Sequence, residues 1–223
     1  MRIGFPVVDT FSGLLAAFAI VSALLQRNRF GEGQCIDVAM FDAAMVMMIS
    51  VIGPYLVTGT RPQKQGNRGY SMSPTADTFP TKDGSITIGA VRQEQFERLC
   101  RVLNIGEIIS DPRFTDKHTR IANGEALRRI VIEALKAKSA EEWEPLLNAA
   151  GVAAGVVREV HEAVALNQLN GRDLKLPIKI PGFNEGQVEV LNAGFRFVHD
   201  GPRIDQPPPR LGEHTREVLA ELG

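Results

Sequence analysis

The side chain best placed for chemistry near the start of the chain is the carboxylate of Asp9. A short segment, Pro6-Val7-Val8, runs into it, and Ser12-Gly13 and the apolar run Leu14–Leu25 follow. Asp9 therefore lies where a strand or loop passes into a helix. The unpaired backbone N–H groups at a helix start favour an anion, so we expect an ionised carboxylate that is held in place. The simpler alternative is that Asp9 only caps the helix.

Other patterns typical of catalytic sites are missing from the sequence. We find no P-loop, no Gly-x-Gly-x-x-Gly, no Ser-His-Asp order and no metal-ligand spacing. Cys35 and Cys100 are expected to be core residues in a reducing compartment. His214 precedes the last expected helix, where a histidine satisfied by local hydrogen bonds is the simpler interpretation.

Two long apolar segments must position Asp9. We expect a helix over about residues 12–29, apolar on nearly every face and ended by Gly31 and Gly33. Gln34–Met40 alternates enough to be a strand, and a second, methionine-rich helix follows from about Phe41. Strand and helix in this order predict part of a doubly wound parallel sheet. Two strands are too few for a stable sheet, so we expect it to be incomplete on its N-terminal side.

The middle of the chain predicts a separate, compact α+β unit. Lys82-Asp83-Gly84 is a hairpin turn between two strand-like segments. Helices are expected at about residues 93–102, 125–138 and 140–149, the last with a capping box of Ser139 and Glu142 and anchored by Trp143. Asp111-Pro112-Arg113-Phe114 is expected to be a turn, residues 152–160 a strand and residues 162–169 a short helix.

These patterns predict an α/β protein with five segments. Residues 1–58 form a partial large α/β domain that carries Asp9, and residues 59–73 are a linker. Residues 74–170 form the small α+β domain, followed by an irregular return linker over 171–190. Residues 191–223 pack back on the large domain and include a short final helix.

The composition is that of a soluble globular protein, with 44% apolar residues, 23% charged residues and a net charge of −1. The lack of a long basic or acidic run argues against a nucleic-acid partner or an electrostatic membrane anchor. Leu14–Leu25 is too short to span a bilayer, and Asp42, Ser50 and Pro54 interrupt Val38–Val57. We therefore expect no membrane partner and a cytoplasmic location.

Several motifs stand in an order known from one protein family. In the first region they are Gly4–Asp9, Ser12-Gly13, Ala16-Ala17, Arg27, Gly31-Glu32-Gly33-Gln34, Ile36-Asp37-Val38 and Asp42. Further along they are Asp111-Pro112-Arg113-Phe114, Glu142-Trp143, Ala149–Val152 and the final Leu211-Gly212-Glu213-His214-Thr215. The sequence resembles the C-terminal part of the class III CoA-transferases, the CaiB/BaiF-type family that includes formyl-CoA transferases and α-methylacyl-CoA racemases.

The resemblance implies that Asp9 is catalytic. It implies an enzyme that moves CoA between an acyl-CoA and a carboxylic acid through an aspartyl-CoA thioester, with coenzyme A as the substrate carrier and no metal. Met40, Gly66, Asn67 and Gly69 are the implied substrate or CoA contacts, the last three on a loop that can close over the aspartate. Backbone N–H groups of that loop or of Ser12-Gly13 could stabilise the oxyanion. The implied assembly is an interlocked homodimer or a complex with a partner chain.

Two departures from the family pattern leave alternatives open. Racemase members often carry Gly-Ala-Ile-Glu-Pro-Gln-Phe where this chain has Gly89–Phe96, so Arg92 stands near the expected glutamate. An α-methylacyl-CoA racemase is therefore the less favoured activity. Family members are also considerably longer, and their first part has no counterpart here. The second alternative is a non-catalytic fragment or one subunit of a split CoA-transferase.

Overall fold

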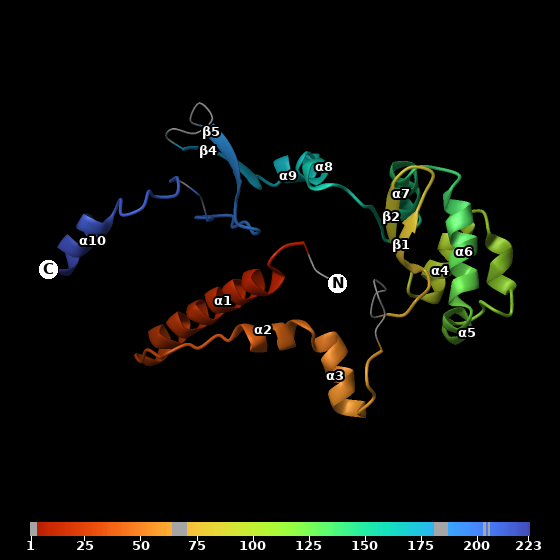
Figure 1. Cartoon of the computed structure of the whole chain (residues 1–223), viewed down its shortest axis with the longest axis horizontal. Helices are drawn as coiled ribbons and strands as arrows, with labels where there is room; N and C mark the ends of the chain where they lie inside the picture. The colour runs from red at the N-terminus through yellow and green to blue at the C-terminus, as the bar shows by residue number, and fades with distance from the viewer. Residues whose placement is uncertain (1–3, 64–70, 181–186, 203, 205) are drawn as a thin grey trace. The chain divides into compact units, whose positions relative to one another are not determined.

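The computed structural model describes residues 4–63, 71–180, 187–202, 204 and 206–223 (Figure 1). The chain divides into two compact units, Met1–Val157 and Arg158–Gly223. Helices and small antiparallel sheets make it a mixed α/β structure. The five segments expected from the sequence stay a prediction.

The first unit begins with three apolar helices: α1 at Val7–Phe30, α2 at Met40–Met47 and α3 at Ile49–Thr58. Gly31 ends α1 in the left-handed conformation with φ +83°, and its N–H donates to the Arg27 carbonyl at 2.7 Å. Glycine takes this conformation without a Cβ clash, which makes it the usual residue at such helix ends. α2 packs against α1, and α3 packs against α2.

Two predictions for this part are wrong. Gln34–Met40 is not a strand, and the described residues 4–58 contain none, so the doubly wound parallel sheet is not confirmed. An alternating sequence forms a strand only where a second strand pairs with its backbone groups. The single helix expected after Phe41 is two helices, α2 and α3, bent by 78° at Met48. Pro54 lies inside α3 and has no N–H to donate to the carbonyl of Ser50, which weakens the helix in the turn after the bend.

The rest of this unit is built on a three-stranded antiparallel sheet in the order β1-β2-β3. The strands are β1 at Ala76–Pro80, β2 at Ser85–Gly89 and β3 at Ala154–Val156. The predicted hairpin is confirmed, with Gly84 in its turn at φ +76°. β3 is shorter than the strand expected over residues 152–160. Ile86 in the central strand pairs with residues of both neighbours.

Three helices lie at the predicted places: α4 at Gln93–Val102, α6 at Gly124–Leu135 and α7 at Ala140–Ala149. α6 and α7 pack on the sheet, and α4 packs on α7. The capping box of α7 is confirmed. The Glu142 N–H donates to Ser139 Oγ at 3.2 Å, and the Ser139 N–H donates to Glu142 Oε2 at 2.8 Å. These bonds satisfy backbone donors that a helix start otherwise leaves unpaired.

Two short elements were not predicted, a 3-10 helix at Gly106–Ser110 and α5 at Lys117–Ala122. Asp116 begins α5, and its Oδ1 accepts the N–H groups of His118 and Thr119 at 2.7 and 3.0 Å. An aspartate at this position is a recognised helix-start signal, so the sequence did indicate this helix. The turn expected at Asp111–Phe114 is confirmed by a hydrogen bond from the Phe114 N–H to the Asp111 carbonyl at 2.8 Å.

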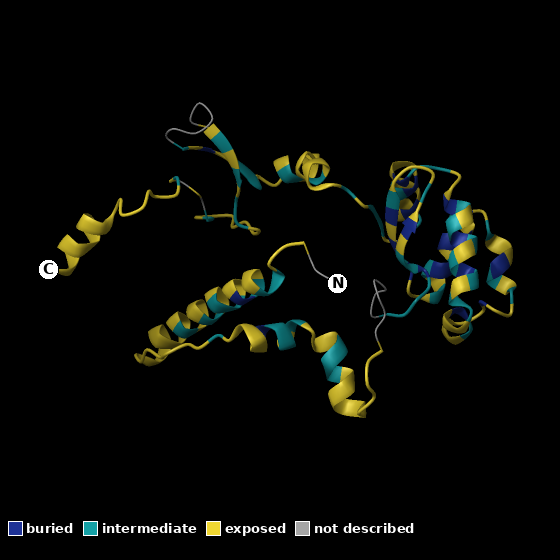
Figure 2. Ribbon diagram, viewed as in Figure 1, coloured by how far each residue is buried: buried dark blue, intermediate teal, exposed yellow. Residues whose placement is uncertain are grey.

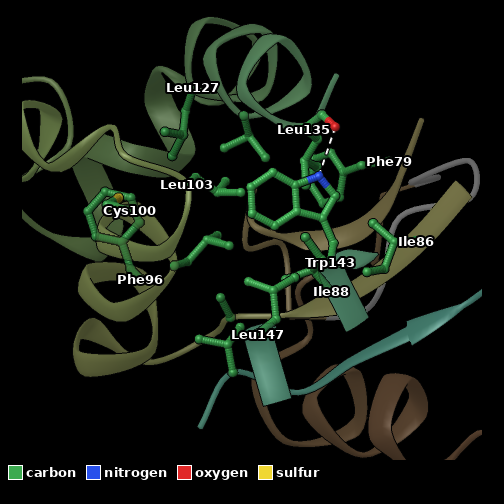
Figure 3. Close-up of a cluster of buried hydrophobic side chains, with 14 of the residues drawn as sticks. Phe79, Ile86, Ile88, Phe96, Cys100, Leu103, Leu127, Leu135, Trp143 and Leu147 are labelled. Carbon is green, nitrogen blue, oxygen red and sulfur yellow. Dashed lines mark hydrogen bonds between the residues drawn. The ribbon is translucent and has the colours of Figure 1, made fainter. Parts of the chain in front are cut away.

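This sheet and its helices enclose a core of their own (Figure 3). Its largest fully buried side chains include Phe79, Phe96, Phe114, Ile86, Ile88, Leu99, Leu127, Leu135 and Leu147. Trp143 anchors α7 as predicted, and its indole Nε1–H donates to the Leu135 carbonyl at 2.9 Å (Figure 3). Figure 2 shows the buried residues gathered in this part of the chain, whereas Ser12 and Ala43 are the only buried residues of α1, α2 and α3.

The second unit holds smaller elements: α8 at Val160–Val164, α9 at Asn167–Asn170, β4 at Lys175–Lys179, β5 at Gln187–Leu191 and α10 at Thr215–Leu222. The expected helix over residues 162–169 is two short helices. β4 and β5 form an antiparallel pair. The prediction that residues 171–190 are irregular is therefore wrong for the residues in these two strands. The short final helix is confirmed.

Candidate functional site

Asp9 lies in the first turn of α1, and its side chain is exposed. The helix begins at Val7, five residues earlier than predicted, with Pro6 in the capping position and no side-chain capping bond. Asp9 is therefore not a helix cap, which removes the simpler explanation for a carboxylate here. The free N–H groups and the dipole of this helix end favour a negative charge at Asp9.

The backbone donors near Asp9 differ from those expected. Thr10 makes the first helical hydrogen bond, from its N–H to the Pro6 carbonyl at 3.0 Å. Ser12 and Gly13 follow inside the helix, so their N–H groups are used in the helical ladder and cannot act as oxyanion donors. The Ser12 hydroxyl also donates to the Val8 carbonyl, at 2.8 Å. The N–H groups that a helix start leaves available here are those of Val8 and Asp9.

The remaining predicted contacts fall in two places. Met40 is the first residue of α2, is 49% exposed, and stands on a helix that packs against α1. Gly66, Asn67 and Gly69 lie outside the described residues. His214 directly precedes α10 in the other unit and makes no side-chain capping bond. Asp9 and Met40 thus lie on adjoining helices, and their roles stay predictions.

The other potentially reactive side chains do not form a second candidate site among the described residues. Within the described ranges, no three His, Cys, Asp or Glu side chains gather closely enough to hold a metal ion. Cys100 is fully buried, and burial raises the pKa of its thiol to about 12. Cys35 is exposed, so the prediction that both cysteines are core residues is wrong for Cys35.

Among the cavities that the described residues form, a cavity that the sequence did not indicate lies beside α3. It has a volume of about 490 Å³ and lies along the C-terminal turns of α3 and the residues that follow. The residues that line it are Ser50, Val51, Pro54, Tyr55, Thr58, Thr60, Arg61, Pro62, Gln63 and Met72. Its size is within the range of small-molecule sites in proteins. No sequence signal marks it, because it depends on the path of the chain after α3.

α1 also carries a large exposed apolar surface. Leu14, Phe18, Val21 and Leu25 are 67%, 70%, 65% and 69% exposed, and their spacing places them on one helical face, here called the α1 stripe. By length and composition α1 could cross a membrane, and α2 with α3 would also pass if the bent pair were one span. The apolar helix is thus longer than the segment judged too short from the sequence. Such a helix needs a partner surface, and its composition does not say whether that is lipid or protein.

Comparison with known proteins identifies relatives of this chain. The model of a family described as CoA-transferase family III matches residues 1–215. The chain is 33% identical to the succinate–glutarate CoA-transferase of Agrobacterium fabrum, covering 100% of this chain and 55% of that protein. It is 32% identical to the acetyl-CoA:oxalate CoA-transferase of Acetobacter aceti, covering 98% of this chain and 54% of that protein.

A solved structure agrees with these matches. The crystal structure of a CaiB/BaiF family protein from Brucella suis superposes with a TM-score of 0.79 at 32% identity, over 100% of this chain and 57% of that chain. The chain therefore spans about half the length of the curated relatives it matches.

Proposed function

Because this chain belongs to CoA-transferase family III, we propose that it supplies the catalytic part of an enzyme that moves CoA between an acyl-CoA and a carboxylic acid. The observation that carries the proposal is Asp9, an exposed carboxylate in the first turn of α1 that has no capping role. The named relatives support transfer to small carboxylic acids. The racemase alternative has no such support.

The proposed reaction is nucleophilic catalysis by the Asp9 carboxylate. One Asp9 oxygen attacks the thioester carbonyl, the C–S bond breaks, and CoA departs as a thiolate. The product on the enzyme is a mixed anhydride of Asp9 and the donor acid. The thiolate then attacks the aspartyl carbonyl, so the donor acid departs as a carboxylate and CoA is held as an aspartyl thioester. The acceptor carboxylate attacks this thioester and expels CoA thiolate. Attack of the thiolate on the acceptor's acyl carbonyl then yields the new acyl-CoA and restores Asp9.

The position of Asp9 suits this sequence of steps. A carboxylate is a weak nucleophile, so the site must contribute positioning and donors for the developing oxyanion. The N–H groups of Val8 and Asp9 point out of the helix start, where its dipole also favours negative charge. We propose that they share this task with Gly66, Asn67 and Gly69, and that Met40 contacts the CoA thioester.

We further propose that polypeptide outside this sequence covers the α1 stripe and completes the large domain, including a doubly wound parallel sheet. The chain spans only about half of its relatives, and α1 to α3 have too few packing partners of their own. The covering polypeptide is another part of the same protein, a second copy or a separate subunit. In this proposal the helices bury against protein rather than lipid, and the enzyme is cytoplasmic and needs no metal.

The test is chemical trapping of the aspartyl thioester. The chain, with any polypeptide that completes it, is incubated with acyl-CoA and then hydroxylamine, which converts an aspartyl thioester into a hydroxamate that mass spectrometry can place. We expect the hydroxamate at Asp9, and expect Asp9→Asn to lack it and to lose transfer at least about a thousandfold. Its folded state should lose only about 0.3–1 kcal/mol, the usual effect of a first-turn carboxylate.

Asp42→Asn is the matched control, because Asp42 is also an exposed carboxylate in the first turn of an apolar helix, α2. It should keep both the hydroxamate and the rate. Transfer that survives Asp9→Asn would show that Asp9 is not the nucleophile. An assembly that neither transfers CoA nor forms the thioester would identify the chain as a non-catalytic fragment or subunit.

A further inference from the structure

β3 is an outer strand of the three-stranded sheet, so one of its edges faces away from β2. The Val157 N–H donates to the Ser85 carbonyl at 2.9 Å, which shows that the backbone groups of Val157 face β2. Such groups alternate in direction along a strand, and those of Ala154 and Val156 therefore point away from β2. A row of unpaired N–H and C=O groups on an outer edge can pair with a strand of another chain.

Two side chains of α7 occupy this edge. Asn148 Oδ1 accepts the Ala154 N–H and Asn148 Nδ2 donates to the Ala154 carbonyl, both at 3.0 Å. Glu144 Oε1 accepts the Val156 N–H at 3.2 Å. Asn148 thus makes with Ala154 the pair of bonds that a neighbouring strand would make. Gly151, at φ +74°, turns the chain back after α7 so that β3 packs beside this helix.

The opposite edge of the sheet, on β1, is also occupied by side chains. Thr78 points away from β2 by the same alternation. Its N–H donates to Asp77 Oδ1 at 2.8 Å, and its carbonyl accepts a bond from Arg128 Nη2 at 3.0 Å. Arg128 Nη1 also donates to Asp77 Oδ2 at 2.6 Å, which holds the two side chains together. Pro80, two residues further on, has no N–H to offer at this edge.

The sequence around β3 makes its edge the more hazardous of the two. Residues 152–157 read Val-Ala-Ala-Gly-Val-Val, with three valines, no charge and no proline. Segments of this length and composition are typical of strands that aggregate. In a second copy, antiparallel pairing centred on Gly155 would place Ala154 opposite Val156, with no side chain at the centre and no like charges to oppose it.

We propose that Asn148 and Glu144 close the β3 edge against pairing with the β3 edge of a second copy. The α+β part of the chain then stays single, and association is left to other surfaces such as the α1 stripe. This role concerns assembly and does not depend on the reaction proposed for Asp9.

The test compares variants that all carry Phe18→Glu, which removes an apolar side chain of the α1 stripe. Asn148→Ala with Glu144→Ala opens the β3 edge, whereas Trp143→Phe weakens the same helix without touching that edge. In sedimentation over a concentration series, the opened variant should form dimers at concentrations at least about tenfold lower than Trp143→Phe does. Adding Ala154→Pro should abolish these dimers, because it removes the outward N–H and leaves the bonds to β2 intact.

Amide hydrogen exchange tests the closure in the unchanged chain and so does not depend on the folding of any variant. The Ala154 and Val156 N–H groups should exchange at least about a hundredfold more slowly than in an unfolded peptide of the same sequence. Exchange at the rate of the peptide would overturn the proposal, as would an opened variant that associates no more strongly than Trp143→Phe. Dimers that persist with Ala154→Pro would also overturn it, since they would place the contact away from this edge.

Discussion

The α1 stripe gives the sharpest test of the proposed assembly. Its four side chains are each exposed by about two-thirds and lie on one face of the helix. We predict that Phe18→Glu, a change in the middle of this face, prevents association with the polypeptide that covers it. Phe18 is 70% exposed, so it makes little contact inside the chain and its replacement should leave α1 folded.

The exposures set the expected magnitude. Complete burial of a Leu, Val or Phe side chain stabilises by about 1.5–3 kcal/mol. Two-thirds of that is about 1–2 kcal/mol per residue, or about 4–8 kcal/mol for the whole stripe. Phe18→Glu removes one share and places a carboxylate against apolar surface, which costs several kcal/mol more. A loss of about 3 kcal/mol or more weakens association by at least about a hundredfold.

Light scattering and sedimentation over a concentration series measure this association, and far-ultraviolet circular dichroism checks the helix content. Leu146→Glu is the control, because Leu146 is also half exposed but lies on α7, in the part of the chain with its own core. It should associate like the unchanged chain. A dispersed, active monomer of the unchanged chain at micromolar concentration would refute the reasoning, as would unchanged association of Phe18→Glu.

Two further predictions concern the part of the chain with a closed core. Trp143→Phe removes the 2.9 Å hydrogen bond to the Leu135 carbonyl. That carbonyl then keeps only a 3.5 Å contact with the Lys138 N–H. We expect the free energy of unfolding, measured by urea titration, to fall by about 1–3 kcal/mol. An unchanged midpoint would contradict this role. At pH 8 a thiol reagent should modify exposed Cys35 in the folded chain and Cys100 only after unfolding, because burial raises the Cys100 pKa to about 12 and keeps the thiol protonated. Mass analysis that finds Cys100 labelled first would contradict it.

The small α+β part could be predicted because its signals are local. Helical spacing of Phe96 and Leu99 predicted α4 at its observed bounds, and Ser139 with Glu142 marked the start of α7. The β4 and β5 pair also had a signal, since Leu176 and Ile178 stand two residues apart between Lys175 and Lys179. Pro177 led instead to the prediction of an irregular segment. Proline is nevertheless tolerated in edge strands, and both strands of a two-stranded pair are edge strands.

The larger features depended on partners that no local pattern reveals. Gln34–Met40 has the alternation of a strand but no paired strand among the described residues 4–58. Asp9 could be singled out by its motif. Its position in the first helical turn, and the N–H donors beside it, became known only from the structure, in which α1 begins at Val7. The cavity beside α3 was not predicted, because it is formed by the turn at Gly59.

The register of the three-stranded sheet has a consequence for synthesis on the ribosome. Ile86 in the central strand pairs with Val156, which is translated seventy residues later. At about 5–20 residues per second, the edge of β2 waits about 4–14 seconds for β3, and the sheet closes only after α4, α6 and α7 have emerged. Where the covering polypeptide is a second copy or a separate subunit, the α1 stripe, made earlier, stays exposed on the nascent chain during that whole interval. In that case chaperone binding should be concentrated on α1, and should end when the partner binds rather than when this sheet closes.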